Sequence, residues 1–175
     1  MFNSENGQAI SKNVKNEIER IKTFDAPLSK PYGLVHAYGG FQEDTTTLTL
    51  TAGVWEKITN ITNDLWIGTE SEGISLILDS LVIKYAGDYY GMLTLAISGL
   101  NGKDFFVRVY NNTQGIAMGY KIGATTTSTA NFIPIPLPLY FECDADDVLE
   151  VQIYSSVNAT VYCRSAVFWL RWYHK

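Results

Sequence analysis

Four acidic side chains gather in a segment whose residue types could bind a metal ion. They fall within six consecutive residues and are Glu142, Asp144, Asp146 and Asp147. Clustered carboxylate oxygens are ligands that Ca²⁺ prefers. The alternative is an acidic turn between two strands, because Asp is a common turn residue. We expect the turn, and therefore no bound metal and no cofactor, although the sequence leaves calcium open.

The histidines offer little to a catalytic centre. A catalytic triad or a zinc site of the usual kind would need His36 or His174. His174 is next to the last residue and should be solvated, and His36 should be an ordinary strand residue. The Gly-Lys pair at 102–103 lacks the first glycine of a phosphate-binding loop, and Asp104 replaces its Ser or Thr. We expect the protein not to be an enzyme.

Two cysteines, Cys143 and Cys163, are the remaining reactive side chains. A disulfide framework needs more cysteines, and a metal site needs a closer pair together with histidine. We expect two small apolar residues in strands, and a cross-strand disulfide is the alternative.

Composition argues against two classes of partner. The 175 residues include 13 basic and 18 acidic side chains, a net charge of −5, with no run of Lys or Arg. A nucleic-acid groove needs a basic stripe, so no nucleic acid is expected. No apolar run reaches the roughly 20 residues of a membrane-spanning helix. The polar start, 1–10, is unlike a signal peptide, so the protein should stay in the cytoplasm or leave it by lysis or assembly.

One helix is predicted, near the start of the chain. Val14, Ile18 and Ile21 follow one another at spacings of four and three, which is one stripe of a helix over about 11–22. A helix of about three turns is too short to be stable alone. It must pack on its own domain, on sister helices or on a docking site of another protein.

Prolines divide the chain into two expected parts. Pro27 and Pro31 end the helical segment and make a stiff joint. We expect an N-terminal docking segment, 1–32, and a second domain, 33–175.

The second part is rich in strand patterns. Residues 89–98 and 148–154 alternate with a period of two, and Asn101-Gly102 is a common hairpin signal. Short strands at this spacing, without helices between them, predict an all-β sandwich or barrel.

Two strands are apolar on both faces. In 89–98 the second face includes Tyr90, Met92 and Ala96, and in 166–173 both faces are bulky. A strand in a monomeric sandwich normally has one polar face. Another copy of the chain is the simplest cover for the second face, so we expect an oligomer. A helix from the first 32 residues is the alternative cover.

Three prolines alternate with apolar residues in 132–141. Pro134, Pro136 and Pro138 are two residues apart, so in an extended chain their missing N–H donors lie on one edge. The segment can therefore be an edge strand that accepts a neighbour on one side only. A polyproline-like connection is the alternative.

The order of these signals resembles the tumour-necrosis-factor-like jelly roll, shared with complement-type heads and many bacteriophage structural proteins. Tyr38-Gly39-Gly40 resembles the first strand, and 47–59 resembles the early meander. Gly87-Asp88-Tyr89-Tyr90-Gly91 resembles the Gly-x-Tyr strand of the family. Asp146-Asp147-Val148-Leu149 resembles its Gly-Asp-x-Leu turn, with Asp146 in place of the glycine, which leaves the turn type open.

The resemblance implies an architecture and an assembly. It implies a jelly-roll β-sandwich that forms trimers, with Tyr89 between the sheets. It places Tyr90 and Met92 at the threefold axis, together with last-strand residues such as Phe168. The expected trimer-interface residues are Tyr90, Met92, Phe106, Tyr110, Phe168 and Trp172.

The polar start and short helix favour the phage branch of the resemblance, because animal members have a signal, an anchor or a stalk. We therefore predict a non-enzymatic virion accessory protein: a trimeric head fibre, capsid decoration or receptor-binding protein, assembled in the host cytoplasm and displayed on the virion. Val14, Ile18 and Ile21 would dock 1–32 to a capsid or tail protein.

Two other functions stay open. One is a carbohydrate-binding module, since Tyr32, Tyr38, Trp66 and Tyr120 could stack on sugar rings instead of packing. The other is a cytokine-like trimeric ligand, which needs an export route. The sequence does not decide between head and tail, nor identify the host, the receptor or a host-surface glycan as a further partner.

Overall fold

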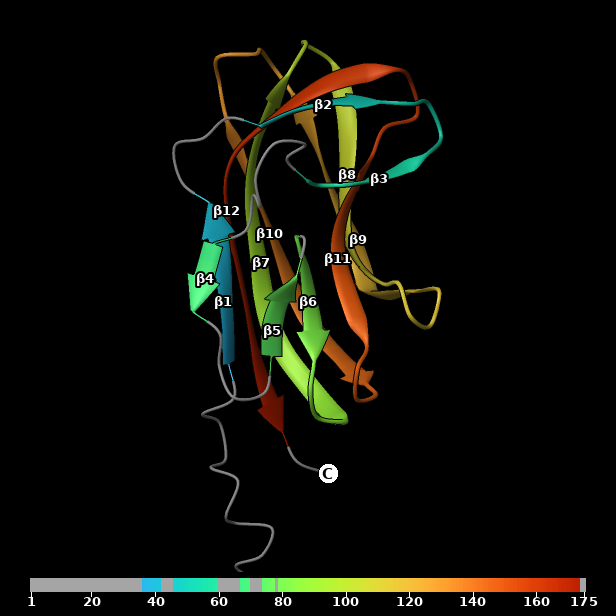
Figure 1. Cartoon of the computed structure of the whole chain (residues 1–175). Coiled ribbons are helices and arrows are strands. Elements are labelled where there is room, and N and C mark those ends of the chain that lie inside the picture. Colours follow the sequence, from blue (N-terminus) through green and yellow to red (C-terminus); the bar gives the residue numbers. More distant parts are fainter. Residues whose placement is uncertain (1–35, 42–45, 60–66, 70–73, 78, 174–175) are drawn as a thin grey trace, which may run out of the picture. The chain divides into compact units, whose positions relative to one another are not determined.

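The part of the chain that the computed structural model describes lies within one compact unit, Gly33–Lys175. It consists of residues 36–41, 46–59, 67–69, 74–77 and 79–173. Every regular element among them is a strand, which confirms the all-β prediction (Figure 1). None of these residues forms a helix long and apolar enough to cross a membrane. The helix predicted over 11–22, with Val14, Ile18 and Ile21, lies outside the described residues.

The described strands form two antiparallel sheets (Figure 1). The first has the order β10 (Ile133–Cys143), β7 (Gly87–Gly99), β12 (Ala159–Tyr173), β1 (His36–Phe41) and β4 (Ile67–Thr69), with β2 (Thr46–Leu50) beside one end of β12. The second has the order β5 (Ile74–Ile77), β6 (Ser80–Ile83), β11 (Val148–Tyr154), β8 (Lys103–Asn111) and β9 (Ile116–Thr126), with β3 (Trp55–Lys57) beside β11.

The core lies between the two sheets. Alternate residues of β7, from Tyr89 through Leu93 to Ile97, are fully buried, and Leu149 and Ile153 of β11 meet them from the second sheet. The Tyr89 hydroxyl donates a hydrogen bond to the carbonyl of Tyr85 at 2.7 Å, so its one polar group is satisfied. The position of Tyr89 is the one that the resemblance implies.

The turn at Asn101-Gly102 does not close a hairpin. It joins β7 of the first sheet to β8 of the second, and the two strands are not paired. The Gly102 N–H donates to the carbonyl of Thr126 at 2.8 Å, and the Thr126 hydroxyl donates to the carbonyl of Leu100 at 2.7 Å. The turn is therefore anchored on β9, and the hairpin prediction is wrong because a turn signal does not specify the partner strand.

The proline-rich segment is a regular strand. β10 pairs with β7 over its whole length, from Ile133 opposite Ile97 to Cys143 opposite Gly87. It is an edge strand with no second neighbour among the described strands. This confirms the edge-strand prediction over the polyproline alternative.

The turn type that the sequence left open at Asp146 is one with a left-handed residue. Asp146 has φ 67°, a conformation in which glycine has no side-chain penalty and Asp is better tolerated than most residues. Its N–H donates to the carbonyl of Ile83 at 2.6 Å, which fixes the turn against the end of β6. Asp146 therefore adopts a conformation that favours the glycine it replaces.

Both cysteines are free and buried, so the cross-strand disulfide is not formed. Burial, together with the nearby charges of Asp147 and Asp144, raises the pKa of the Cys143 thiol to about 12. Burial alone raises the pKa of the Cys163 thiol to about 12. Both thiols therefore stay neutral at pH values at which an exposed cysteine ionises.

Alkaline pH is expected to destabilise the fold through these thiols. In the unfolded chain they ionise near pH 9.0, so between that pH and about 12 the unfolded state holds fewer protons than the native state. The free energy of unfolding should then fall by about 1.4 kcal/mol per pH unit for each thiol. Urea unfolding at several pH values measures this slope, and Cys163→Ala should reduce it by one thiol's share. If the free energy of unfolding falls equally steeply with pH in both proteins, the buried Cys163 thiol is not a cause of the alkaline loss of stability.

Candidate functional site

The outer face of the first sheet is apolar where β10, β7 and β12 run side by side. The strand register places Met92 between Pro138 and Trp169, and Tyr90 between Tyr140 and Arg171. Met92 is 37% and Tyr140 69% exposed, while Tyr90 and Trp169 are half-buried. We call these side chains, with the flanking residues Pro134, Pro136, Thr94, Ala96 and Val167, the β10–β7–β12 face.

Contacts between side chains hold the centre of this face in place. The rings of Tyr90 and Trp169 meet edge to face, with centroids 5.7 Å apart and an interplanar angle of 87°. Arg171 Nη1 donates to the Tyr90 hydroxyl at 3.2 Å. The aromatic surface is thus ordered before any partner arrives, which lowers the entropy cost of binding.

The edge of the sandwich next to this face presents one more tyrosine, Tyr120. The pairing of β8 with β9 shifts register between Val107 and Val109, and in β9 Gly119 has φ 70°. This irregularity turns Tyr120 outward, 84% exposed. A hollow of about 470 Å³ is lined by Gly119, Tyr120, Pro138, Leu139 and Tyr140. Its lining therefore includes residues of the β10–β7–β12 face.

The six residues predicted for the trimer interface lie in three places. Tyr90 and Met92 share the β10–β7–β12 face. Phe168 and Trp172 are 0% and 4% exposed and belong to the core, so their assignment to an interface is corrected. The register explains the error: both pair with core positions of β7, whereas Trp169 pairs with Met92.

Phe106 and Tyr110 are on the opposite side of the molecule, on the outer face of the second sheet. Both are half-buried residues of β8. Phe106 pairs with Gly123 of β9, and a Cβ built on Gly123 would lie 2.7 Å from the Phe106 ring. The ring therefore lies against Gly123 of the neighbouring strand, where a larger residue would not fit. The structure does not bring these two residues together with Tyr90 and Met92.

Two residues of the apolar surface were missed, Trp169 and Tyr140. Tyr140 is in phase with the three exposed prolines of β10, so the period of two could have identified it. The sequence could not show which residues of β12 face outward, because the residues on both faces are bulky. Tyr120 was named from the sequence as an aromatic that could stack on a sugar, and the structure places it 84% exposed beside the irregular pairing of β9.

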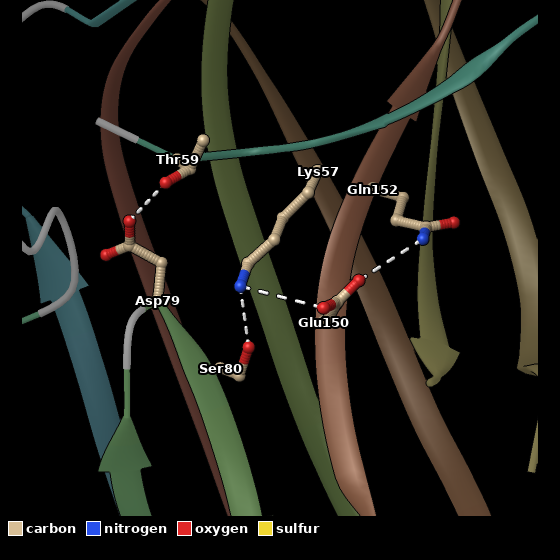
Figure 2. A network of polar contacts seen from close by, with 6 residues as sticks. All are labelled: Lys57, Thr59, Asp79, Ser80, Glu150 and Gln152. Atoms are coloured by element: carbon tan, nitrogen blue, oxygen red, sulfur yellow. Dashed lines mark hydrogen bonds and ion pairs between the residues drawn. The ribbon is translucent and has the colours of Figure 1, made fainter. Parts of the chain in front are cut away.

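The outer face of the second sheet is polar where β3, β6 and β11 meet (Figure 2). Lys57 Nζ donates to Ser80 Oγ at 2.7 Å and lies 3.6 Å from Glu150 Oε1. Gln152 Nε2 donates to Glu150 Oε2 at 3.4 Å. Glu150 is therefore neutralised by Lys57 and held by Gln152.

The acidic segment that could hold calcium is bonded to its own chain. Asp147 is 1% exposed, and its Oδ2 accepts from Asn111 Nδ2 at 2.7 Å, Gln114 Nε2 at 2.7 Å and the backbone N–H of Asp144 at 2.9 Å. Within the described ranges, no group of three or more His, Cys, Asp or Glu is arranged to hold a metal ion. The segment is a turn between β10 and β11. Through Asp147 it is hydrogen-bonded to Asn111 and Gln114, which connects it to the turn between β8 and β9.

Comparisons with known proteins identify the architecture. No protein-family model matches the sequence, and no curated protein does. Solved structures match along most of the chain. The Eiger TNF of S. frugiperda is 11% identical with a TM-score of 0.59, covering 82% of this chain and 94% of its own. The fold is a tumour-necrosis-factor-like jelly roll.

Two further jelly rolls come from different settings. The PRD1 vertex protein is 14% identical with a TM-score of 0.54, covering 81% of this chain and 99% of its own. The globular domain of the zebrafish complement 1qA protein is 11% identical with a TM-score of 0.53, covering 80% and 98%. At such identities the likeness establishes the jelly roll itself, which confirms the predicted fold class.

Proposed function

We propose that this chain is a non-enzymatic virion accessory protein whose jelly roll forms a trimer that is displayed on a phage particle. The β10–β7–β12 face is the observation that supports the trimer. It gathers Tyr, Trp, Met and Arg side chains, which are enriched in the centres of protein interfaces. Burying it against further copies removes an apolar patch from water, and that removal is the driving force of assembly.

A closed ring is an assembly that these surfaces allow. The apolar face of β7 and β12 and the edge with Tyr120 are different surfaces of one copy. A contact between two different surfaces is head-to-tail, and it closes into a ring when the rotation allows. The trimer that the resemblance implies is one such ring.

The virion role rests on two supports. One is the shared jelly roll with the PRD1 vertex protein, a phage protein. The other is the amphipathic pattern of Val14, Ile18 and Ile21, which suits a segment that docks to a capsid or tail protein. Three copies on one anchor would add weak contacts to a host surface through their effective concentration.

Light scattering of the full chain tests the trimer. We expect about three chain masses for the natural protein and one chain mass for Met92→Glu, because the substitution would place three carboxylates in an apolar contact. Leu100→Glu is the matched control: this side chain is 58% exposed in the β7–β8 turn, away from the face, so its trimer should persist. A monomeric natural protein would overturn the assembly, and a trimeric Met92→Glu would overturn the role proposed for the β10–β7–β12 face.

The same measurement on residues 33–175 locates the assembly. A trimer of this fragment assigns the contact to the jelly roll. A trimer of the full chain alone would move the contact to residues 1–32 and overturn the role proposed for the β10–β7–β12 face.

A further inference from the structure

Arg108 of β8 lies in an aromatic cradle on the outer face of the second sheet. Its guanidinium carbon is 4.1 Å from the centre of the Trp55 ring and 4.6 Å from that of the Tyr110 ring. Nε and Nη2 both donate to Gln152 Oε1, at 3.0 and 2.8 Å. One oxygen thus receives two of the five guanidinium N–H groups, and it belongs to a neutral amide.

Among the residues that the structure describes, no group of opposite charge balances Arg108. No carboxylate of the described residues forms an ion pair with it, because the nearby Glu150 is engaged by Lys57 (Figure 2). Burial lowers the pKa of Arg108, which shows that the cation is partly desolvated, while Tyr110 acts in the opposite direction. A half-buried cation without an anionic partner is costly, and a ligand that supplies an anion would offset that cost.

Aromatic rings continue from the cradle across the same face. The Trp55 and Tyr154 rings are 5.1 Å apart, and the Tyr154 and Phe106 rings are 6.1 Å apart. A second cation, Lys121, lies 5.2 Å from the centre of the Phe106 ring and has no acidic partner among the described residues. The face therefore combines a half-buried aromatic floor with two cations, in a chain whose net charge is −5.

We infer that this surface binds an acidic sugar, with the ring of the sugar on Tyr154 beside Trp55 and its carboxylate on Arg108. The apolar C–H face of a pyranose matches an aromatic floor, and the planar guanidinium fork matches a carboxylate. The ammonium group of Lys57, whose side chain is 27% exposed, can donate hydrogen bonds to hydroxyl groups of the ligand. An acidic peptide would satisfy Arg108 but would leave the aromatic floor less well matched.

The inference deepens the proposed display role by naming a ligand class, and its test does not need the trimer. The full chain is titrated with trigalacturonate and with sialyllactose, and binding is followed by calorimetry and by the side-chain N–H signals of the tryptophans in NMR. We expect at least one of the two to bind, and to perturb one tryptophan. We also expect binding to weaken as salt is added, because the contact is partly electrostatic.

Matched variants and ligands locate the contact. Arg108→Gln should weaken binding about tenfold, the usual effect of losing one charge-assisted pair, and Arg108→Lys should fall between it and the natural protein. Arg164→Gln is the control, since Arg164 also lies over a ring, 5.4 Å from that of Phe132, but belongs to β12. The methyl ester of trigalacturonate and lactose should each bind about tenfold more weakly than their charged counterparts.

Several results would overturn the inference. They are no binding of either acidic sugar, equal binding of charged and neutral forms, equal loss in Arg164→Gln, or a hexaglutamate peptide that binds as tightly as the sugars. If the natural protein is monomeric by light scattering but binds the sugar, the proposed trimer is wrong and the proposed sugar site is supported. If the natural protein is a trimer that binds neither sugar, the proposed trimer is supported and the proposed sugar site is wrong.

Discussion

Gly91→Ala is expected to lower the free energy of unfolding by about 3 kcal/mol, because the added methyl group has no room. A Cβ on Gly91 would collide with the carbonyl oxygen of Trp169 and would lie 2.8 Å from Leu170 Cδ2. The carbonyl belongs to the backbone of β12, so β7 and β12 would have to separate at the centre of the first sheet. Urea unfolding of the two proteins at neutral pH measures the difference.

Gly102→Ala is the control that measures backbone strain without a steric clash. Gly102 has φ 73°, and nothing lies within 4 Å of a Cβ built there. Alanine should therefore cost only the penalty of a left-handed conformation, about 1 kcal/mol. Equal losses in the two variants would mean that the contact with β12 is relaxed at little cost.

Asp147→Ala is expected to lower the free energy of unfolding by a similar amount, about 3 kcal/mol. The substitution leaves the donors of Asn111, Gln114 and Asp144 without their shared acceptor, and Asn111 is fully buried. Asp147→Asn keeps the shape and one acceptor oxygen but loses the charge, so we expect it to fall between. Thermal and urea unfolding measure the series.

The neighbouring residue supplies the control for this series. Asp146→Gly removes an exposed carboxylate from the same turn and relieves its left-handed backbone. We expect this variant to be as stable as the natural protein, or more stable by up to about 1 kcal/mol. A loss of stability like that of Asp147→Ala would show that the negative charge of the turn matters, and not the three hydrogen bonds.

The sequence was sufficient where a local pattern decides the structure. Period-two alternation identified the strands, and the spacing of Pro134, Pro136 and Pro138 identified an edge. It was insufficient where distant strands decide. Whether Phe168 or Trp169 faces outward depends on which β7 residue pairs with each, since both are large and aromatic. The spacing of strands also does not tell which sheet contains Phe106, because β7 and β8 are adjacent in the chain but lie in different sheets.

The aromatic cradle of Arg108 also could not be predicted from the sequence. Trp55, Arg108 and Gln152 belong to three strands, and the sequence separates them by more than 40 residues each. No sequence motif identifies them, and none of the three residue types predicts a site by itself. Only the pairing of β11 with both β3 and β8 brings them together.

The three prolines of β10 also determine what the protein cannot become. An edge strand with free N–H groups can template the growth of a fibre, because each added strand recreates the same edge. On β10 three of those donors are missing, and their side chains face solvent. Copies that meet at this edge cannot extend the ladder, so crowding drives them toward contacts between faces. At high concentration, β10 should therefore not nucleate amyloid.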